Sequence, residues 1–185
     1  AFSGCTGLNS VIIPDSVTNI GENAFYGCTG LREVTLPNSI TYFGYRLFQN
    51  CTGLSSINYP AGLTECHNWA DIFKGCSSLK RITVPEGITT LCPYVFSGAN
   101  YLEEVILPQS LTIIGSSAFS GCVSMKSIEI PDSVTEIRSG AFYGCTGLNS
   151  VDFPTALTLI STQAFYNCTG MTALSFLSND TVTSI

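Results

Sequence analysis

Phenylalanine recurs at a fixed interval along almost the whole chain, and this interval constrains the fold more than any other feature. Successive members are 23 residues apart, with one interval of 25: Phe2, Phe25, Phe48, Phe73, Phe96, Phe119, Phe142 and Phe165. A short fixed period indicates one structural unit copied along an axis. We therefore expect eight repeats in a single solenoid over residues 1–185. The recurring residues would build the scaffold, and the positions that do not recur would carry any binding information.

One repeat shows which elements the unit contains. Ile128-Glu129-Ile130 alternates apolar and polar residues, which predicts a short strand with one buried face, and Pro131 ends it. Val134–Ile137 predicts a second short extended piece, and the following Ala-Phe-x-x-Cys segment predicts a helical or 3₁₀ turn. The expected fold is thus an α/β repeat solenoid, with a parallel β-sheet on one face and short helical or 3₁₀ turns on the other.

The columns of this repeat resemble a known class of leucine-rich repeat. Residues 8–28 read L-N-S-V-I-I-P-D-S-V-T-N-I-G-E-N-A-F-Y-G-C, which is similar to the unit of BspA-like repeats, the class also called TpLRR. Where better-known leucine-rich repeats carry an asparagine ladder after the strand, this chain has proline followed by Ser or Thr positions such as Ser133 and Thr135. The resemblance covers the whole chain and implies a leucine-rich-repeat solenoid.

Composition and motifs argue against several classes of function. The net charge is −6 and the seven basic residues are scattered, which disfavours nucleic-acid binding and attraction to anionic lipid. No apolar stretch approaches the roughly 18 residues of a membrane helix. The chain lacks a phosphate-binding loop, a nucleophile elbow and metal-ligand spacing such as Cys-x-x-Cys. We therefore expect no catalysis, no cofactor and no metal site.

Most of the nine cysteines belong to one column of the repeat. Because Ala99 replaces cysteine in the fifth repeat, the column requires a small apolar group, and buried free thiols are the favoured interpretation. A disulfide ladder is the competing one, since neighbouring turns lie within disulfide range. Cys66 and Cys92 lie outside the column, and we expect no bridge between them because their positions should face opposite ways. The column is Cys5, Cys28, Cys51, Cys76, Cys122, Cys145 and Cys168.

The outward strand face is the expected binding surface, because repeat solenoids usually bind ligands there. Its candidate residues lie eight or ten positions after each phenylalanine: Glu33, Thr35, Asn58, Arg81, Thr83, Glu104, Glu129 and Asp152. These positions could equally be solvated filler. The set lacks the aromatic clustering of a tight interface and suits a broad, multivalent contact.

Two further groups of residues stand out from the repeat. His67 and Trp69 fall where the third repeat is two residues longer, and they form either an interaction bulge or a plain structural one. Cys66-His67 could also suggest a thiol nucleophile with its base, but sequence neighbours on an extended segment point to opposite faces. Three sequons are possible glycosylation sites, at Asn50, Asn167 and Asn179, and repeat drift from Gly-Cys-Thr explains the first two.

The resemblance implies a function that periodicity alone does not. BspA-like proteins are typically surface or secreted proteins associated with adhesion, so we expect a non-catalytic module that binds a protein partner such as a host matrix or cell-surface protein. The alternative is an intracellular interaction scaffold, which a column of reduced cysteines would also suit. Neither end resembles the polar cap of a solenoid, so we also expect a fragment of a longer array, or end-to-end association.

Overall fold

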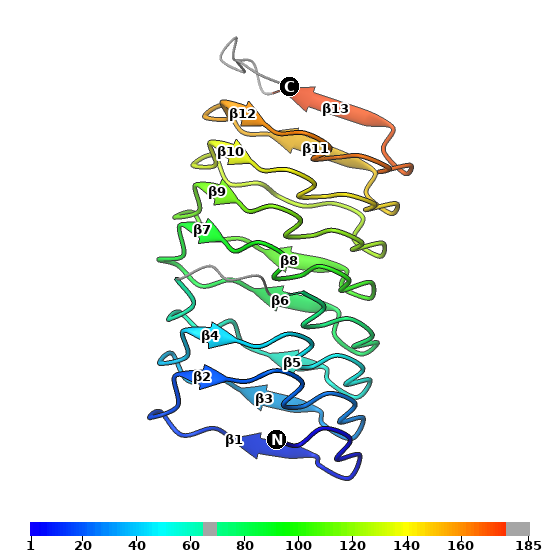
Figure 1. The fold of residues 1–185 in the computed structure, drawn as a ribbon. Coiled ribbons are helices and arrows are strands. Elements are labelled where there is room, and N and C mark those ends of the chain that lie inside the picture. The colour runs from blue at the N-terminus through cyan, green and yellow to red at the C-terminus, as the bar shows by residue number, and fades with distance from the viewer. Residues whose placement is uncertain (65–69, 177–185) are drawn as a thin grey trace.

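The chain forms a stack of similar turns around one long axis. The computed structural model describes residues 1–64 and 70–176, and the turns follow one another from the N-terminus at one end of the stack to the C-terminus at the other (Figure 1). Most described turns contribute one short strand to each of two rows, and the strands pair in parallel. The leucine-rich-repeat solenoid predicted from the sequence is confirmed.

The first row of strands lies just before the proline of each repeat. Its members are β1 (Ser10–Ile12), β3 (Glu33–Thr35), β5 (Ser56–Ile57), β6 (Arg81–Thr83), β8 (Glu104–Ile106), β11 (Ser150–Phe153) and β13 (Ala173–Phe176). They form three separate sheets, in the orders β1-β3-β5, β6-β8 and β11-β13. Between β8 and β11 the sixth turn makes only a single bridge, from Glu129 to Asp152.

The second row contains two-residue strands near the end of each repeat. They are β2 (Asn19–Ile20), β4 (Tyr42–Phe43), β7 (Thr90–Leu91), β9 (Ile113–Ile114), β10 (Glu136–Ile137) and β12 (Leu159–Ile160). β2 pairs with β4, and the other four form the sheet β7-β9-β10-β12. In each of these strands the second residue is buried, as the alternation of the sequence predicts.

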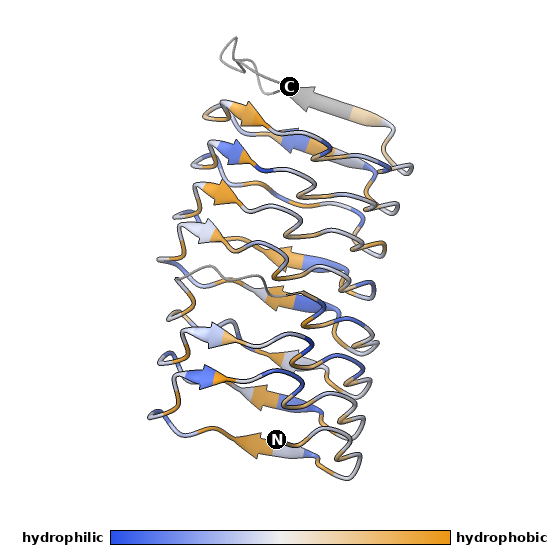
Figure 2. Ribbon diagram, viewed as in Figure 1, coloured by the Kyte–Doolittle hydropathy of each residue, from blue (hydrophilic) through white to orange (hydrophobic). Residues whose placement is uncertain are grey.

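The core consists of columns of like residues that pack on one another from turn to turn. Hydrophobic segments occur throughout the stack, although matching strands can differ in hydropathy, as β9 and β10 do (Figure 2). The phenylalanine rings stack in one continuous column with centroids 4.9 to 6.1 Å apart. The described residues bury no polar or charged residue, so hydrophobic burial holds the turns together.

The predicted helical or 3₁₀ turns are wrong, because the described residues contain no helix. Around Phe119 two residues with left-handed backbone, Ser117 at φ 54° and Gly121 at φ 76°, interrupt any right-handed helix. The Phe119 amide donates to the Ala141 carbonyl of the next turn at 2.8 Å, so it is not free for a helical bond. Isolated turns such as Cys122 N–H to Phe119 C=O fill this side of the solenoid.

The predicted count of eight repeats is also not borne out as eight complete turns. Six of the intervals between successive phenylalanines are described in full. The interval from Phe48 to Phe73 contains residues 65–69, and the unit that starts at Phe165 extends into residues 177–185; both segments lie outside the described residues. Counting one marker residue overestimates the turns because it scores partial units as complete ones.

The phenylalanine column should contribute stability in proportion to burial. Phe119 is fully buried between two neighbouring rings, whereas Phe2 is 45% exposed at the first turn. We expect Phe119→Ala to lower the free energy of unfolding by about 3–5 kcal/mol, because it removes buried area and leaves a cavity. Urea unfolding measures this, with Phe2→Ala as the matched control. An equal cost for both substitutions would contradict the stacked core.

Candidate binding face

The eight residues predicted for the strand face all lie exposed on the first row of strands or on its continuation in the sixth turn. The register places residues at the same repeat position side by side: Ile12 is opposite Thr35, Thr83 opposite Ile106, and Glu129 opposite Asp152. Their role in binding remains a prediction.

Two ion pairs cross the face between the fourth and fifth turns. The Arg81 guanidinium binds the Glu104 carboxylate, with Nε to Oε2 at 2.7 Å, and Lys80 Nζ lies 3.0 Å from Glu103 Oε1. Lys80 Nζ also lies 5.5 Å from the ring centroid of Tyr101. These groups are solvent-exposed, so each pair contributes about 0–1 kcal/mol of stability. The positive charge of Arg81 is therefore already compensated by a neighbour.

The strand ladder of this face is interrupted at two places. No backbone hydrogen bond joins β5 to β6, or residues 103–107 to residues 126–130, within the described part of the chain. Elsewhere the equivalent bonds are present, as from the Glu103 amide to the Lys80 carbonyl at 2.9 Å and from the Asn149 amide to the Lys126 carbonyl at 3.0 Å. Each interruption exposes main-chain groups on the strand face.

A column of glycines explains where the turns approach closely. A Cβ on Gly30, Gly53, Gly147 or Gly170 would overlap the carbonyl oxygen of a residue in the preceding turn. At the two interrupted steps the column contains Ser78 and Ser124 instead. Their hydroxyls donate to the Thr52 and Asn100 carbonyls, both at 2.7 Å. At these two steps a serine side chain therefore lies between the turns, where other steps have glycine.

A side chain in this column does not by itself open the ladder. Tyr101 occupies it in the fifth turn, and the neighbouring strands β6 and β8 still pair. At each of the two interrupted steps, a serine hydroxyl in this column donates to a backbone carbonyl of the preceding turn. The sequence interpretation missed Ser78 and Ser124, although the glycines at this position, Gly7, Gly30, Gly53, Gly147 and Gly170, form a column that would have revealed them.

A shallow hollow lies at each interruption. The first has a volume of about 420 Å³ and is lined by Ser56, Asn58, Arg81 and Thr83 among others. The Asn58 side chain is already committed, because its Oδ1 accepts from the Leu36 amide at 2.7 Å and its Nδ2 donates to the Leu36 carbonyl at 2.8 Å. The first hollow thus contains three residues predicted for the strand face, Asn58, Arg81 and Thr83. Of these, Asn58 binds the backbone of Leu36 and so has a structural role.

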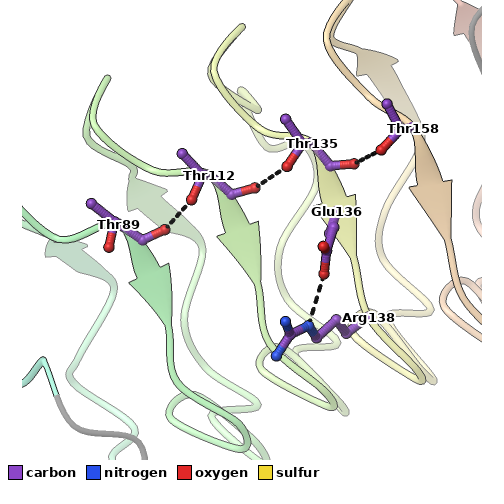
Figure 3. Close-up of polar contacts among 6 residues, drawn as sticks. All are labelled: Thr89, Thr112, Thr135, Glu136, Arg138 and Thr158. Carbon is purple, nitrogen blue, oxygen red and sulfur yellow. Dashed lines mark hydrogen bonds and ion pairs between the residues drawn. The ribbon is translucent and has the colours of Figure 1, made fainter.

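Threonine hydroxyls form a ladder just before the second row of strands (Figure 3). The hydroxyls of Thr112, Thr135 and Thr158 donate to the backbone carbonyl of the threonine in the preceding turn at 2.9, 3.2 and 3.1 Å. Ser133 donates to the Leu111 carbonyl at 2.6 Å in the same way. The positions of Ser133 and Thr135 therefore serve the scaffold, as an asparagine ladder does in other repeats.

The column cysteines are free thiols, as the favoured interpretation predicted, although Cys5 is exposed and Cys168 is only partly buried. From Cys28 onward each thiol donates to the carbonyl of a phenylalanine in the preceding turn at 2.9–3.2 Å. Burial raises the pKa of Cys51 and of Cys122 to about 12, so these thiols are unreactive at neutral pH. No group of metal-ligating side chains occurs among the described residues.

Cys92 departs from the prediction, because it is disulfide-bonded and fully buried. Its side chain has no exposed surface and therefore lies in the core. Glycine occupies the equivalent position in other turns, for example Gly44 and Gly115. Cys66, the partner considered from the sequence, lies outside the described residues.

The remaining candidates divide by location. Asn50 and Asn167 have φ near 60° and occupy a column that is otherwise glycine, which explains why asparagine is tolerated there. Asn50 is partly buried and its Nδ2 donates to the Tyr26 hydroxyl at 3.3 Å, whereas Asn167 is exposed. Asn179, and the bulge residues His67 and Trp69, lie outside the described residues.

Comparison with known proteins agrees with this geometry. The family model for the BspA type leucine rich repeat region matches residues 1–122 and 70–185, in six copies. The chain therefore belongs to the BspA-type leucine-rich-repeat family. None of the curated proteins matches it.

Solved bacterial structures share the fold. A leucine-rich repeat protein of Bacteroides ovatus is 29% identical with a TM-score of 0.56, over 83% of this chain and 48% of that one. The T. pallidum protein TpLRR is 29% identical with a TM-score of 0.55, over 89% and 68%. A leucine rich cell surface protein of Faecalibacterium prausnitzii is 26% identical with a TM-score of 0.56, over 95% and 55%. This chain spans about half the length of the first and third proteins.

Close approach at the glycine column should make substitutions there position-dependent. We expect Gly147→Ser to lower the free energy of unfolding by about 1–3 kcal/mol, because its Cβ would overlap the Val123 carbonyl oxygen. Gly7→Ser is the control, since a Cβ at Gly7 meets no atom within 4 Å. Urea unfolding measures both, and similar costs for the two substitutions would refute the close-approach explanation.

The buried thiols should make stability fall at alkaline pH. The pKa of Cys122 rises from 9.0 to about 12 on burial, so its contribution is present below pH 9 and is lost as pH rises towards 12. Each such thiol should cost about 1.4 kcal/mol per pH unit in that window. We expect Cys122→Ala to reduce the loss between pH 8 and pH 10.5 by about 2 kcal/mol in urea unfolding under reducing conditions. The same reduction in Cys5→Ala, whose thiol is exposed, would contradict this assignment.

Proposed function

We propose that residues 1–185 act as one non-catalytic protein-binding module of a surface or secreted protein, which contacts its partner through the strand face. The observation that carries this proposal is the in-register row of exposed, mostly polar side chains along the first row of strands. Such a face suits a broad contact in which several weak sites act together.

Membership of the BspA-type family supports a surface or secreted location, since these leucine-rich-repeat proteins are generally protein-binding or surface-associated. The Faecalibacterium prausnitzii relative is described as a leucine rich cell surface protein. The disulfide at Cys92 supports the same location, because disulfides persist mainly in oxidising compartments. No described helix is long and apolar enough to cross a bilayer.

The free cysteine column favours an intracellular interaction scaffold as a second candidate. Its weight is small, however. Five of the column thiols are buried in the core. For two of them, Cys51 and Cys122, the raised pKa keeps the thiol protonated in any compartment. The column therefore discriminates poorly between the two locations, whereas the disulfide at Cys92 supports an oxidising one.

The leucine-rich-repeat family is typically non-catalytic, which supports the absence of enzymatic activity in the proposal. An exposed thiol with a neighbouring base would be the first requirement of a cysteine nucleophile. Cys28, Cys51, Cys76, Cys122 and Cys145 are instead buried, and each donates to a main-chain carbonyl.

End-to-end contact between solenoids is a further part of the proposal. The first turn carries an apolar hollow lined by Ala1, Phe2, Val11 and Pro14, with Phe2 45% exposed. Light scattering over a range of concentrations tests this contact: mass should rise with concentration for the native chain and less for Phe2→Ser.

The binding test uses immobilised fibronectin, fibrinogen, laminin and collagens as probes, with the disulfide intact. We expect saturable binding to at least one of them. Replacing Arg81 and Glu104 together, or Glu129 and Asp152 together, by alanine should weaken it about tenfold. The matched control is Glu22→Gln, an exposed carboxylate on the turn side of the solenoid.

Two outcomes would overturn the proposal. If the folded chain binds none of these proteins, adhesion to host matrix fails. If it binds but the strand-face variants and Glu22→Gln behave alike, the contact surface lies elsewhere on the solenoid.

A further inference from the structure

The second interruption of the strand ladder brings together a hollow, a half-exposed isoleucine and unpaired carboxylates. We propose that it is a docking groove for an extended, basic segment of a partner protein, which inserts an apolar side chain beside Ile106. This inference rests on the proposed binding role of the strand face and assigns the partner's chemistry at one place on it.

The groove is a built hollow between the fifth and sixth turns. It has a volume of about 190 Å³ and is lined by Ile106, Leu107 and Gln109 from one turn and by Glu129, Ile130 and Asp132 from the next. A cavity of about 150 Å³ accommodates benzene, so this hollow can accept one aromatic or branched aliphatic side chain.

Apolar side chains underlie the groove, although most of the surface that it exposes is polar. Leu107 and Ile130 are buried beneath it, while Ile106 is 44% exposed although it sits on a strand among polar neighbours. A half-exposed isoleucine beside a hollow offers a contact that an apolar partner side chain would bury. The other strongly exposed isoleucine of this face, Ile12, lies in the first turn.

The rim of the groove is acidic. Glu129 and Asp132 are exposed, and within the described residues neither carboxylate has an ion pair or a side-chain hydrogen bond. Asp152 adds a third carboxylate on the neighbouring turn, opposite Glu129. Arg81 and Lys80, the basic residues of the fourth turn, are paired with Glu104 and Glu103, and the exposed Lys126 of the sixth turn makes no ion pair with these carboxylates, which leaves the three carboxylates in excess. Charge complementarity therefore selects a partner with Lys or Arg side chains.

The open ladder adds main-chain recognition. No bond joins residues 103–107 to residues 126–130, so the main-chain groups by which these segments would pair, such as the Lys126 amide, make no hydrogen bond across this step. An extended peptide can bind such groups through its own backbone while alternate side chains enter the pockets. We attribute the open ladder to Ser124, whose hydroxyl donates to the Asn100 carbonyl of the preceding turn at 2.7 Å.

The first interruption lacks this combination, which is why it carries no such assignment. Its hollow is lined mainly by small polar residues, and its charged member, Arg81, is already bound to Glu104. Apolar surface is exposed in it too, with Ile57 and Ile82 in the lining, but it offers no unpaired charge.

The test selects binders from a random-peptide display library on the immobilised intact chain, followed by affinity measurement of the winning peptides. We expect winners rich in Lys or Arg alternating with Val, Leu or Phe, with affinity that falls as salt is raised. The variant Glu129→Gln/Asp132→Asn, and separately Ile106→Ser, should each weaken binding at least tenfold. Glu22→Gln, on the turn side, should leave it unchanged.

Ser124→Gly provides a variant that removes no lining side chain. It should close the ladder and weaken the same peptides at least fivefold, with hydrogen exchange at the Lys126 amide showing whether the ladder has closed. Winners that are acidic or neutral, or whose binding survives the groove variants, would overturn this assignment. Such peptides would still leave the strand face as a binding surface if Arg81→Ala/Glu104→Ala weakened them. A library that yields no winner would also overturn the groove, whereas the proposed function is decided separately by the matrix proteins.

Discussion

Register between neighbouring turns is the constraint on which the rest of this structure depends. A single turn cannot bury its own phenylalanine, leucine and cysteine, so stability comes from placing each of them on the same residue of the next turn. The ring column, the thiols bound to phenylalanine carbonyls and the threonine ladder each require the same register. Since all three repeat along the axis, a shift in one turn would disturb every column at once.

The same constraint explains how the chain can acquire a surface for recognition. Residues that point into the core or bridge to the next turn cannot vary without loss of packing, whereas the outward strand positions face solvent. Serine in place of glycine at positions 78 and 124 is a milder departure, because other main-chain bonds still join these turns while the strand ladder opens. The Phe48 amide donates to the Ile72 carbonyl at the first step, and β9 pairs with β10 at the second. A hollow therefore lies on the strand face at each place where the ladder opens.

The sequence predicted the solenoid, both rows of strands, the proline that follows the first row and most of the cysteine column, because each of these repeats with the period. It failed for features that depend on contacts between particular turns. The left-handed residues Ser117 and Gly121 exclude a helix, yet neither is unusual as a residue type. The disulfide at Cys92 and the hydrogen bond from the Leu36 amide to the Asn58 side chain each occur in only one of the described turns, so the repeat pattern does not predict them. The binding face could be located from the pattern, but its hollows could not, since they arise from the spacing of backbones.

The central claim is that serine at positions 78 and 124 of the glycine column interrupts the hydrogen bonding between neighbouring strands of the first row. Amide hydrogen exchange of the native chain tests it directly, because hydrogen-bonded amides in a packed ladder are protected. The account predicts fast exchange at Lys80 and Lys126 and slow exchange at Ser55, Glu103 and Asn149, whose amides donate to the preceding turn. Uniform protection of all five amides would contradict it.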